Sequence, residues 1–193
     1  MKIVRADAMG FCQGVARAVK IAQASLEKAH LAGEEAYVTG ELVHNQRVTD
    51  RLEKKGLVTL DPNKVPEKPA VVVIRAHGVT DRRRKELEGT GVDICDATCP
   101  LVSRAQNLIR EEAMKGRHVV VVGVPGHGET VSLMGVRQSS FEEIQATLVS
   151  DADDLQAIPP DVPLLVMVQS TFPQRQWEEI RAGLEHMAAR RSV

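Results

Sequence analysis

Short apolar runs alternate along the chain with longer stretches in which apolar residues recur every three or four positions. The short runs predict strands, and the longer stretches predict amphipathic helices. The run AVVVIRA at 70–76 is apolar apart from Arg75, which is typical of a strand buried on both faces of a parallel sheet. Strands are expected at 2–6, 36–40, 70–76, 92–97, 118–123, 146–150 and 163–170, and helices at 14–33, 45–56, 80–91, 100–116, 151–158 and 172–192.

The order of strands and helices begins again near Pro100, which stands in the first turn of an expected helix. Alternation of strands with helices favours parallel sheets, so the predicted fold class is α/β. We expect two similar units with small parallel sheets flanked by helices. Residues 1–99 form the first unit, with the N-terminal strand and the Cys12 loop, and residues 100–193 form the second. Both are of ordinary domain size.

Composition excludes several classes of function. The chain has 193 residues, of which 43% are hydrophobic and only 3% aromatic, and its 25 Lys and Arg are balanced by 26 Asp and Glu. This balance argues against broad electrostatic binding to nucleic acid or to an anionic membrane, and the few aromatics argue against a base-stacking surface. Neither a signal-like apolar run at the N-terminus nor a stretch of about 20 apolar residues is present, so we expect a cytoplasmic protein.

The chain contains three cysteines, Cys12, Cys95 and Cys99. An odd number in a reducing compartment argues against a disulfide framework and favours buried thiols, catalysis or metal binding. Cys95 lies within an expected strand and is interpreted as a small apolar core residue. Cys12 stands between Gly10 and Gly14, which suggests a tight turn with close approach of the backbone.

Reactive side chains recur just after the expected strands. In open parallel sheets ligands bind at the carboxyl ends of the strands, where helix N-termini also favour anions. A face with thiols, imidazoles, a carboxylate and hydroxyls suits a phosphorylated ligand beside a metal. The side chains in question are Cys12, His44, Asn45, His77, Cys99, His127, Glu129, Ser170 and Thr171.

The identity of such a metal is open from spacing alone. Zinc sites usually contain close pairs such as C-x-x-C, whereas Cys95 and Cys99 are four positions apart across a strand end. Cys12 and Cys99 can meet only through the fold, and soft thiolates suit zinc and iron–sulfur clusters alike. A histidine at a strand end can also serve merely as a turn or cap residue, and Glu129 as a first-turn helix acid.

Six segments together resemble one family. GFCQGV, ELVHN, AHGV, DATCPLV, GHGE and QST occur in the order and at spacings similar to those of 4-hydroxy-3-methylbut-2-enyl diphosphate reductase, the LytB or IspH family. The resemblance implies two thirds of a trefoil of three α/β domains around a central [4Fe–4S] cluster. It also implies the last step of the methylerythritol phosphate route to isoprenoids, in which the allylic hydroxyl of the substrate is removed to give isopentenyl and dimethylallyl diphosphates.

The resemblance also implies roles for individual residues. Cys12 and Cys99 match two of the three cysteine ligands of the cluster, and Glu129 matches the carboxylate that delivers protons. Ser170 stands where the family usually has threonine, so a hydroxyl is kept. A reduced ferredoxin or flavodoxin is the implied electron donor. The imidazoles that line the pocket and the diphosphate site correspond to His44, His77 and His127.

The family's third cysteine and third domain have no match in residues 1–193, and GHGE departs from the usual GHPE. We expect Cys95 not to replace the missing thiolate. Three interpretations follow: half of a split enzyme completed by a second chain, a fragment of a longer gene product, or a non-catalytic descendant. Two alternatives come from other classes. One is a zinc or thiol module using Cys95, Cys99 and a histidine, and the other is a phosphate-binding domain without metal.

Overall fold

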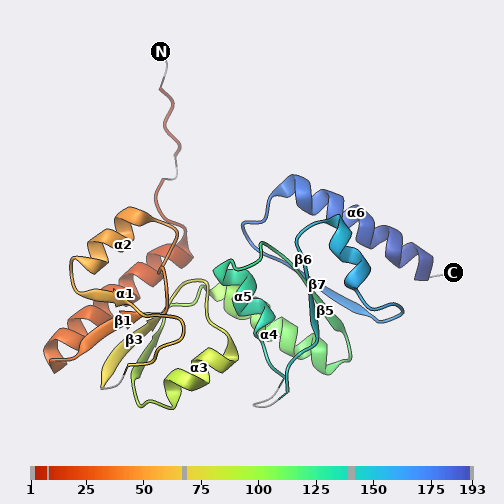
Figure 1. Ribbon diagram of the computed structural model, residues 1–193. Coiled ribbons are helices and arrows are strands. Elements are labelled where there is room, and N and C mark those ends of the chain that lie inside the picture. Colours follow the sequence, from red (N-terminus) through yellow and green to blue (C-terminus); the bar gives the residue numbers. More distant parts are fainter. Residues whose placement is uncertain (1–2, 8, 67–68, 139–141, 192–193) are drawn as a thin grey trace. The chain divides into compact units, whose positions relative to one another are not determined.

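The computed structural model describes residues 3–7, 9–66, 69–138 and 142–191. The chain divides into two compact units: Met1–Ala76 with Thr90–Pro100, and His77–Gly89 with Leu101–Val193. The boundary between the units was expected after residue 99, and the chain passes for the last time from the first unit to the second after Pro100. Residues 77–89, expected in the first unit, group instead with the second. Figure 1 follows the chain through both units.

The first unit is built on a four-stranded parallel sheet with the strand order β2-β1-β3-β4. Its central strand β3 pairs on one side with β1 and on the other with β4. All five residues of β3 are buried, as its apolar sequence predicts. The elements of this unit are α1 (Gln13–Ala32), β1 (Glu35–Val38), α2 (Gln46–Glu53), β2 (Leu57–Thr59), β3 (Ala70–Ile74) and β4 (Asp93–Asp96).

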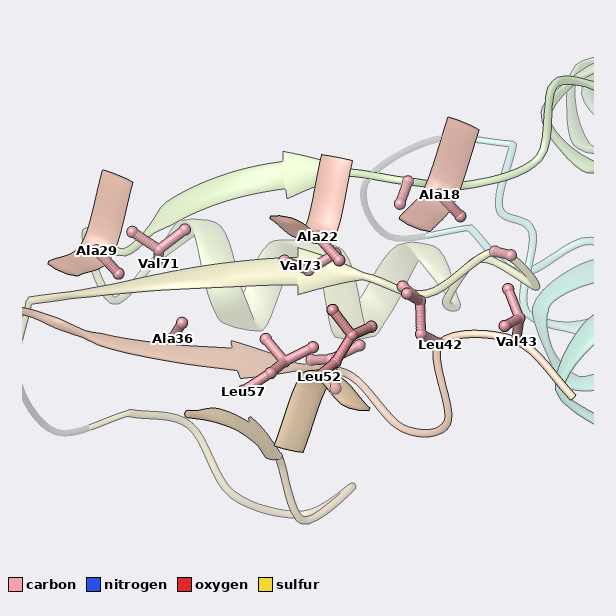
Figure 2. Packing of buried hydrophobic residues seen from close by; sticks show 13 residues of the cluster. Ala18, Ala22, Ala29, Ala36, Leu42, Val43, Leu52, Leu57, Val71 and Val73 are labelled. Atoms are coloured by element: carbon pink, nitrogen blue, oxygen red, sulfur yellow. The ribbon is translucent and has the colours of Figure 1, made fainter. Parts of the chain in front are cut away.

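Helix α1 packs on this sheet through small side chains. Ala18, Ala22 and Ala29 are all buried. They are four and seven positions apart, which places them on the same side of the helix. Figure 2 shows Ala29 next to Val71 and Ala22 next to Val73 of β3. The helix ends at Gly33, whose φ of 70° is the left-handed conformation that glycine adopts without strain.

The second unit has a three-stranded parallel sheet with the order β6-β5-β7. Residues of β5 alternate between two cores: Val120 and Val122 join the cluster with Ile180, while Val119 and Val121 join the cluster with Ile109. The elements are α3 (Asp81–Glu88), α4 (Pro100–Met114), β5 (His118–Val122), α5 (Gly128–Met134), β6 (Ala146–Val149), a 3₁₀ helix η1 (Ala152–Ala157), β7 (Leu164–Val168) and α6 (Gln174–Arg191).

The predicted α/β class with two small parallel sheets is confirmed. One expected strand is wrong: residues 3–6 of the predicted strand 2–6 have no regular secondary structure, and residue 2 lies outside the described residues. The pattern of apolar residues there is strand-like, but a strand also needs a neighbour. Two short elements, β2 and α5, were not predicted. In the part of the chain that the structure describes, none of the helices is both long and apolar enough to cross a membrane.

Candidate functional site

Two thiols of the first unit converge beside Gly14. Cys12 is the N-cap residue of α1, and Cys99 directly precedes Pro100, where α4 begins. A Cβ atom placed on Gly14 would lie 2.8 Å from the Sγ of Cys99 and 3.9 Å from the Sγ of Cys12. The two sulfurs are therefore no farther apart than the sum of these distances. Because Gly14 has no side chain, both sulfurs fit next to its backbone.

Backbone contacts hold Cys99 at this place. The guanidinium of Arg17 on α1 donates to the carbonyl of Thr98 at 2.9 Å and to that of Asp96 at 3.2 Å. The N–H of Cys99 donates to the carbonyl of Ala76 at 2.8 Å. Helix α1, which begins at the first cysteine, is thus tied to the loop that carries the second.

Cys95 has a different environment. It pairs with Val73 in the sheet and packs, partly buried, against the core of the first unit. This is the small apolar role expected for a buried free cysteine. A zinc module that uses Cys95 and Cys99 together finds no support in this packing.

The donor chemistry of the thiol pair suits a soft metal centre. Thiolates are the ligands that zinc and iron–sulfur clusters share, so the pair alone is compatible with both. A [4Fe–4S] cluster is commonly held by four cysteines, or by three with one iron left open. Cys12 and Cys99 could therefore supply two of its ligands. A further ligand has to come from outside this pair.

His44 lies in the first unit, in the segment between β1 and α2. Its side chain is 56% exposed, and its Nδ1 lies 3.0 Å from Oε2 of Glu41. The next residue, Asn45, caps α2 by accepting a hydrogen bond from the N–H of Val48 at 3.1 Å. The imidazole of His44 therefore lies just before the N-terminus of α2 and is exposed to solvent.

In the second unit, Glu129 and Ser170 form one hydrogen-bonded pair. Glu129, in the first turn of α5, is only 6% exposed. Its Oε1 accepts from the N–H of Ser170 at 2.8 Å, and its Oε2 accepts from the Ser170 hydroxyl at 2.6 Å. A buried carboxylate needs such donors, and Ser170 supplies two. The pair can pass a proton between a hydroxyl and a carboxylate.

Two histidines of the second unit lie in ring contact. The ring centroids of His77 and His127 are 5.2 Å apart, in an edge-to-face arrangement. His127 is the N-cap of α5, and its Nδ1 accepts from the N–H of Glu129 at 3.2 Å. Because Nδ1 accepts, the proton of the neutral ring sits on Nε2, which is therefore a donor.

Sequence reasoning missed Gln169, which is 4% exposed. Its Oε1 accepts from the N–H of Val124 and the hydroxyl of Thr130, both at 2.9 Å, and its Nε2 donates to the hydroxyl of Thr171 at 2.7 Å. It thereby joins the loop after β5 to the end of β7. A polar residue directly after the apolar run LLVMV was the available signal. Arg17 was also missed, because its contacts reach across about 80 residues of sequence. Gly14 was expected to allow a close approach at Cys12, but the approach of Cys99 to it was not predicted.

The fold and the site together define a parallel α/β protein with a pair of thiols that directly precede two helices, α1 and α4, a pattern suited to metal binding. The sequence model of the family described as LytB protein matches residues 3–192. The chain belongs to this family, as its six motifs predicted.

Individual relatives agree with this assignment. The chain is 36% identical over 186 residues to 4-hydroxy-3-methylbut-2-enyl diphosphate reductase of Alkaliphilus oremlandii, covering 96% of this chain and 63% of that protein. It is 32% identical over 190 residues to the reductase of the same name from Caldanaerobacter subterraneus, covering 97% and 64%. The chain thus spans less than two thirds of the length of these relatives.

Solved structures give the same result. The chain is similar to the E-1-hydroxy-2-methyl-but-2-enyl-4-diphosphate reductase of Plasmodium falciparum, with a TM-score of 0.82 and 25% identity over 95% of this chain and 56% of that one. A second similar structure is (E)-4-hydroxy-3-methyl-but-2-enyl diphosphate reductase, described as the terminal enzyme of the non-mevalonate pathway. Its TM-score is 0.77, with 25% identity over 97% of this chain and 63% of that one.

Proposed function

We propose that the chain supplies two α/β units of an iron–sulfur reductase acting on 4-hydroxy-3-methylbut-2-enyl diphosphate. In this reaction the allylic C–O bond breaks, the hydroxyl leaves as water, and two electrons and two protons are taken up. The products are isopentenyl and dimethylallyl diphosphates. The observation that carries the proposal is the approach of the Cys12 and Cys99 sulfurs beside Gly14. It is supported by the similarity of the chain to reductases of this substrate.

The group assigned to the thiol pair is a [4Fe–4S] cluster, with Cys12 and Cys99 as two of its ligands. When bound, such a cluster supplies electrons and an iron that acts as a Lewis acid. The third cysteine ligand is proposed to come from a third α/β unit, in the part of the relatives that residues 1–193 do not match. A reduced ferredoxin or flavodoxin is the proposed electron donor, and the cytoplasm the proposed compartment.

Glu129 is proposed as the catalytic acid. Its position is supported by two hydrogen bonds from Ser170, at 2.8 and 2.6 Å. A carboxyl group at this place can deliver the proton that the departing hydroxyl needs to leave as water. The Ser170 hydroxyl is the neighbour through which Glu129 can be protonated again.

The three histidines are proposed to bind the diphosphate. His127 presents its Nε2 as a donor because its Nδ1 accepts from the backbone. His77 lies against the same ring, and His44 is exposed at the start of α2. Donors of this kind bind phosphate oxygens and fix the orientation of the substrate.

The thiol pair can be tested by anaerobic reconstitution with iron and sulfide of this chain co-expressed with the unmatched part of the Alkaliphilus oremlandii reductase, the proposed source of the third cysteine. We expect a brown protein in which Cys12→Ser and Cys99→Ser each reduce bound iron at least about tenfold, because each removes one of two thiolate ligands. Cys95→Ser is the matched control, since Cys95 packs in the core, and it should retain iron. Iron and sulfide are measured per chain, with circular dichroism to confirm folding.

Two outcomes would overturn the assignment. Colourless protein that retains zinc, and loses it in both Cys99→Ser and Cys95→Ser, would point to the zinc module. Inorganic diphosphate binding that survives Cys12→Ser, in a protein that takes up no iron, would point to a phosphate-binding domain without metal.

A further inference from the structure

Residues 39–45, which connect β1 to α2, are tied to the end of the neighbouring strand β3. The N–H of Arg75, directly after β3, donates to the hydroxyl of Thr39 at 3.2 Å. The N–H of Ala76 donates to the carbonyl of Leu42 at 3.0 Å. Leu42 is only 2% exposed and packs in the core of the first unit, where Figure 2 shows it. The backbone of this connection is therefore held in place by both hydrogen bonds and burial.

The guanidinium of Arg75 lies against the backbone of Gly40 in the same connection. A Cβ atom placed on Gly40 would lie 2.8 Å from Nη1 and 3.4 Å from Cδ of Arg75. The φ of Gly40 is 124°, a conformation that glycine adopts without strain. Burial lowers the pKa of the Arg75 guanidinium, and the carboxylate of Glu41 counteracts this effect. Arg75 is thus a half-buried cation that attracts the side chain of Glu41, the residue after Gly40.

Glu41 in turn determines which nitrogen of His44 carries a proton. Nδ1 of His44 lies 3.0 Å from Oε2 of Glu41. An ionised carboxylate only accepts hydrogen bonds, so Nδ1 of His44 is the donor. The opposite holds for His127, whose Nδ1 accepts from a backbone N–H. In the neutral ring of His44, Nε2 is therefore an acceptor, and it becomes a donor only when the ring takes up a second proton.

We infer that Glu41 is a positioning residue that holds a proton on Nδ1 of His44, so that His44 contacts the diphosphate through Nε2 as an imidazolium ion. The second proton comes from solvent, and a phosphate oxygen accepts the hydrogen bond that the new N–H donates. The carboxylate of Glu41 balances the charge of the imidazolium ion. The two side chains are 41% and 56% exposed, so a moderate effect on affinity is expected. This assignment rests on the proposed function, which makes His44 a ligand of the diphosphate.

The protonation of the His44 ring can be followed by NMR of the chain with ¹⁵N-labelled histidine, because the two tautomers and the imidazolium ion give different nitrogen shifts. In the neutral rings we expect the proton on Nδ1 of His44 and on Nε2 of His127. Saturation with inorganic diphosphate at the same pH should convert His44 to the imidazolium ion. Glu41→Ala should remove the preference for Nδ1, whereas Glu41→Gln keeps a carbonyl acceptor and should retain it.

The affinity for inorganic diphosphate, measured by titration calorimetry, provides a second readout. Loss of a negative charge would by itself strengthen the binding of an anion. Glu41→Ala should instead weaken binding about threefold to tenfold, because His44 loses its partner. Glu53→Ala removes an exposed carboxylate of α2 and is the matched control, which should not weaken binding. In a His44→Ala background, Glu41→Ala should weaken binding no further, since Glu41 acts through His44.

Two results would overturn the inference. One is a proton on Nε2 in the neutral ring of His44, and the other is Glu41→Ala protein that binds diphosphate at least as tightly as the original chain. Unchanged diphosphate binding in His44→Ala would instead contradict the proposed role of this histidine as a ligand. The tautomer of His44 would then still decide whether Glu41 fixes its proton.

Discussion

At the scale of single residues, Gly14 is the position on which the thiol pair depends. An added Cβ would lie 2.8 Å from the Sγ of Cys99, closer than carbon and sulfur approach without displacement. The Cys99 side chain would have to leave its present position beside Gly14. The helix itself would tolerate the change, because alanine is a better helix former than glycine by about 0.5–1 kcal/mol.

Gly14→Ala is therefore expected to separate the site from the fold. Bound iron after anaerobic reconstitution should fall several-fold, while the free energy of unfolding stays the same or rises by up to about 1 kcal/mol. Gln13→Ala changes the preceding, exposed residue of the same helix turn and should alter neither quantity. Full iron loading in Gly14→Ala would contradict the close approach of the two sulfurs.

At the scale of elements, the second unit depends on the link between the loop after β5 and the end of β7. Gln169 makes this link, and Gly123 makes room for it: a Cβ there would lie 2.4 Å from the Thr130 hydroxyl and 3.2 Å from the Gln169 Oε1. The loop leads into α5, which carries Glu129, and Ser170 follows Gln169 directly. The geometry of the acid and its hydroxyl partner therefore rests on one buried amide.

Gln169→Leu should destabilise the second unit by on the order of 2–4 kcal/mol. The Thr130 hydroxyl loses its acceptor in a buried place, and the Val124 N–H loses the same acceptor in a partly buried one. Urea unfolding measures this loss. Gln156→Leu makes the same chemical change at an exposed position of η1 and should stay within about 0.5 kcal/mol of the original. Equal free energies of unfolding for the two variants would show that the hydrogen bonds of Gln169 do not stabilise the second unit.

The elements also show where local sequence signals suffice. Helix α1 follows from the helical spacing of its apolar residues and from Gly33 at its end, and strand β3 follows from its short, continuous apolar run. Strand β2, with three residues, is too short to display alternation. Helix α5, with seven residues, begins in the glycine-containing segment GHGET. The prediction of a strand at 2–6 was wrong for another reason. A strand has to pair with a second segment, and the apolar pattern of one segment does not show whether such a partner exists.

The candidate site could be predicted in its residue types but not in its geometry. The placement of Cys12, Cys99 and Glu129 next to expected strands or helices pointed to one functional face. That the two thiols meet at Gly14 depends on Arg17 reaching carbonyl groups about 80 positions away. Contacts of this range leave no periodic trace in a single sequence.

At the scale of the whole molecule, charge and exposed apolar surface act together. The formal net charge is −1 at pH 7, and the isoelectric point is about 6.6. Net charge keeps copies of a protein apart, and that repulsion vanishes at the isoelectric point. Ile3 and Val4 expose most of their surface, so they are available for contact once repulsion is lost.

We therefore expect self-association of the isolated chain to peak near pH 6.6. The sign follows from the charge: above this pH the chain is increasingly negative, and below it increasingly positive. Light scattering at low ionic strength should rise from about pH 8.5 toward the isoelectric point and fall again near pH 5.5. Val4→Asp should lower the maximum and shift it to slightly lower pH, because it removes an apolar side chain and adds a negative charge. Leu31→Asp adds the same charge away from the N-terminal segment. If both variants lower scattering equally, charge alone governs association, and the N-terminal segment has no part in it.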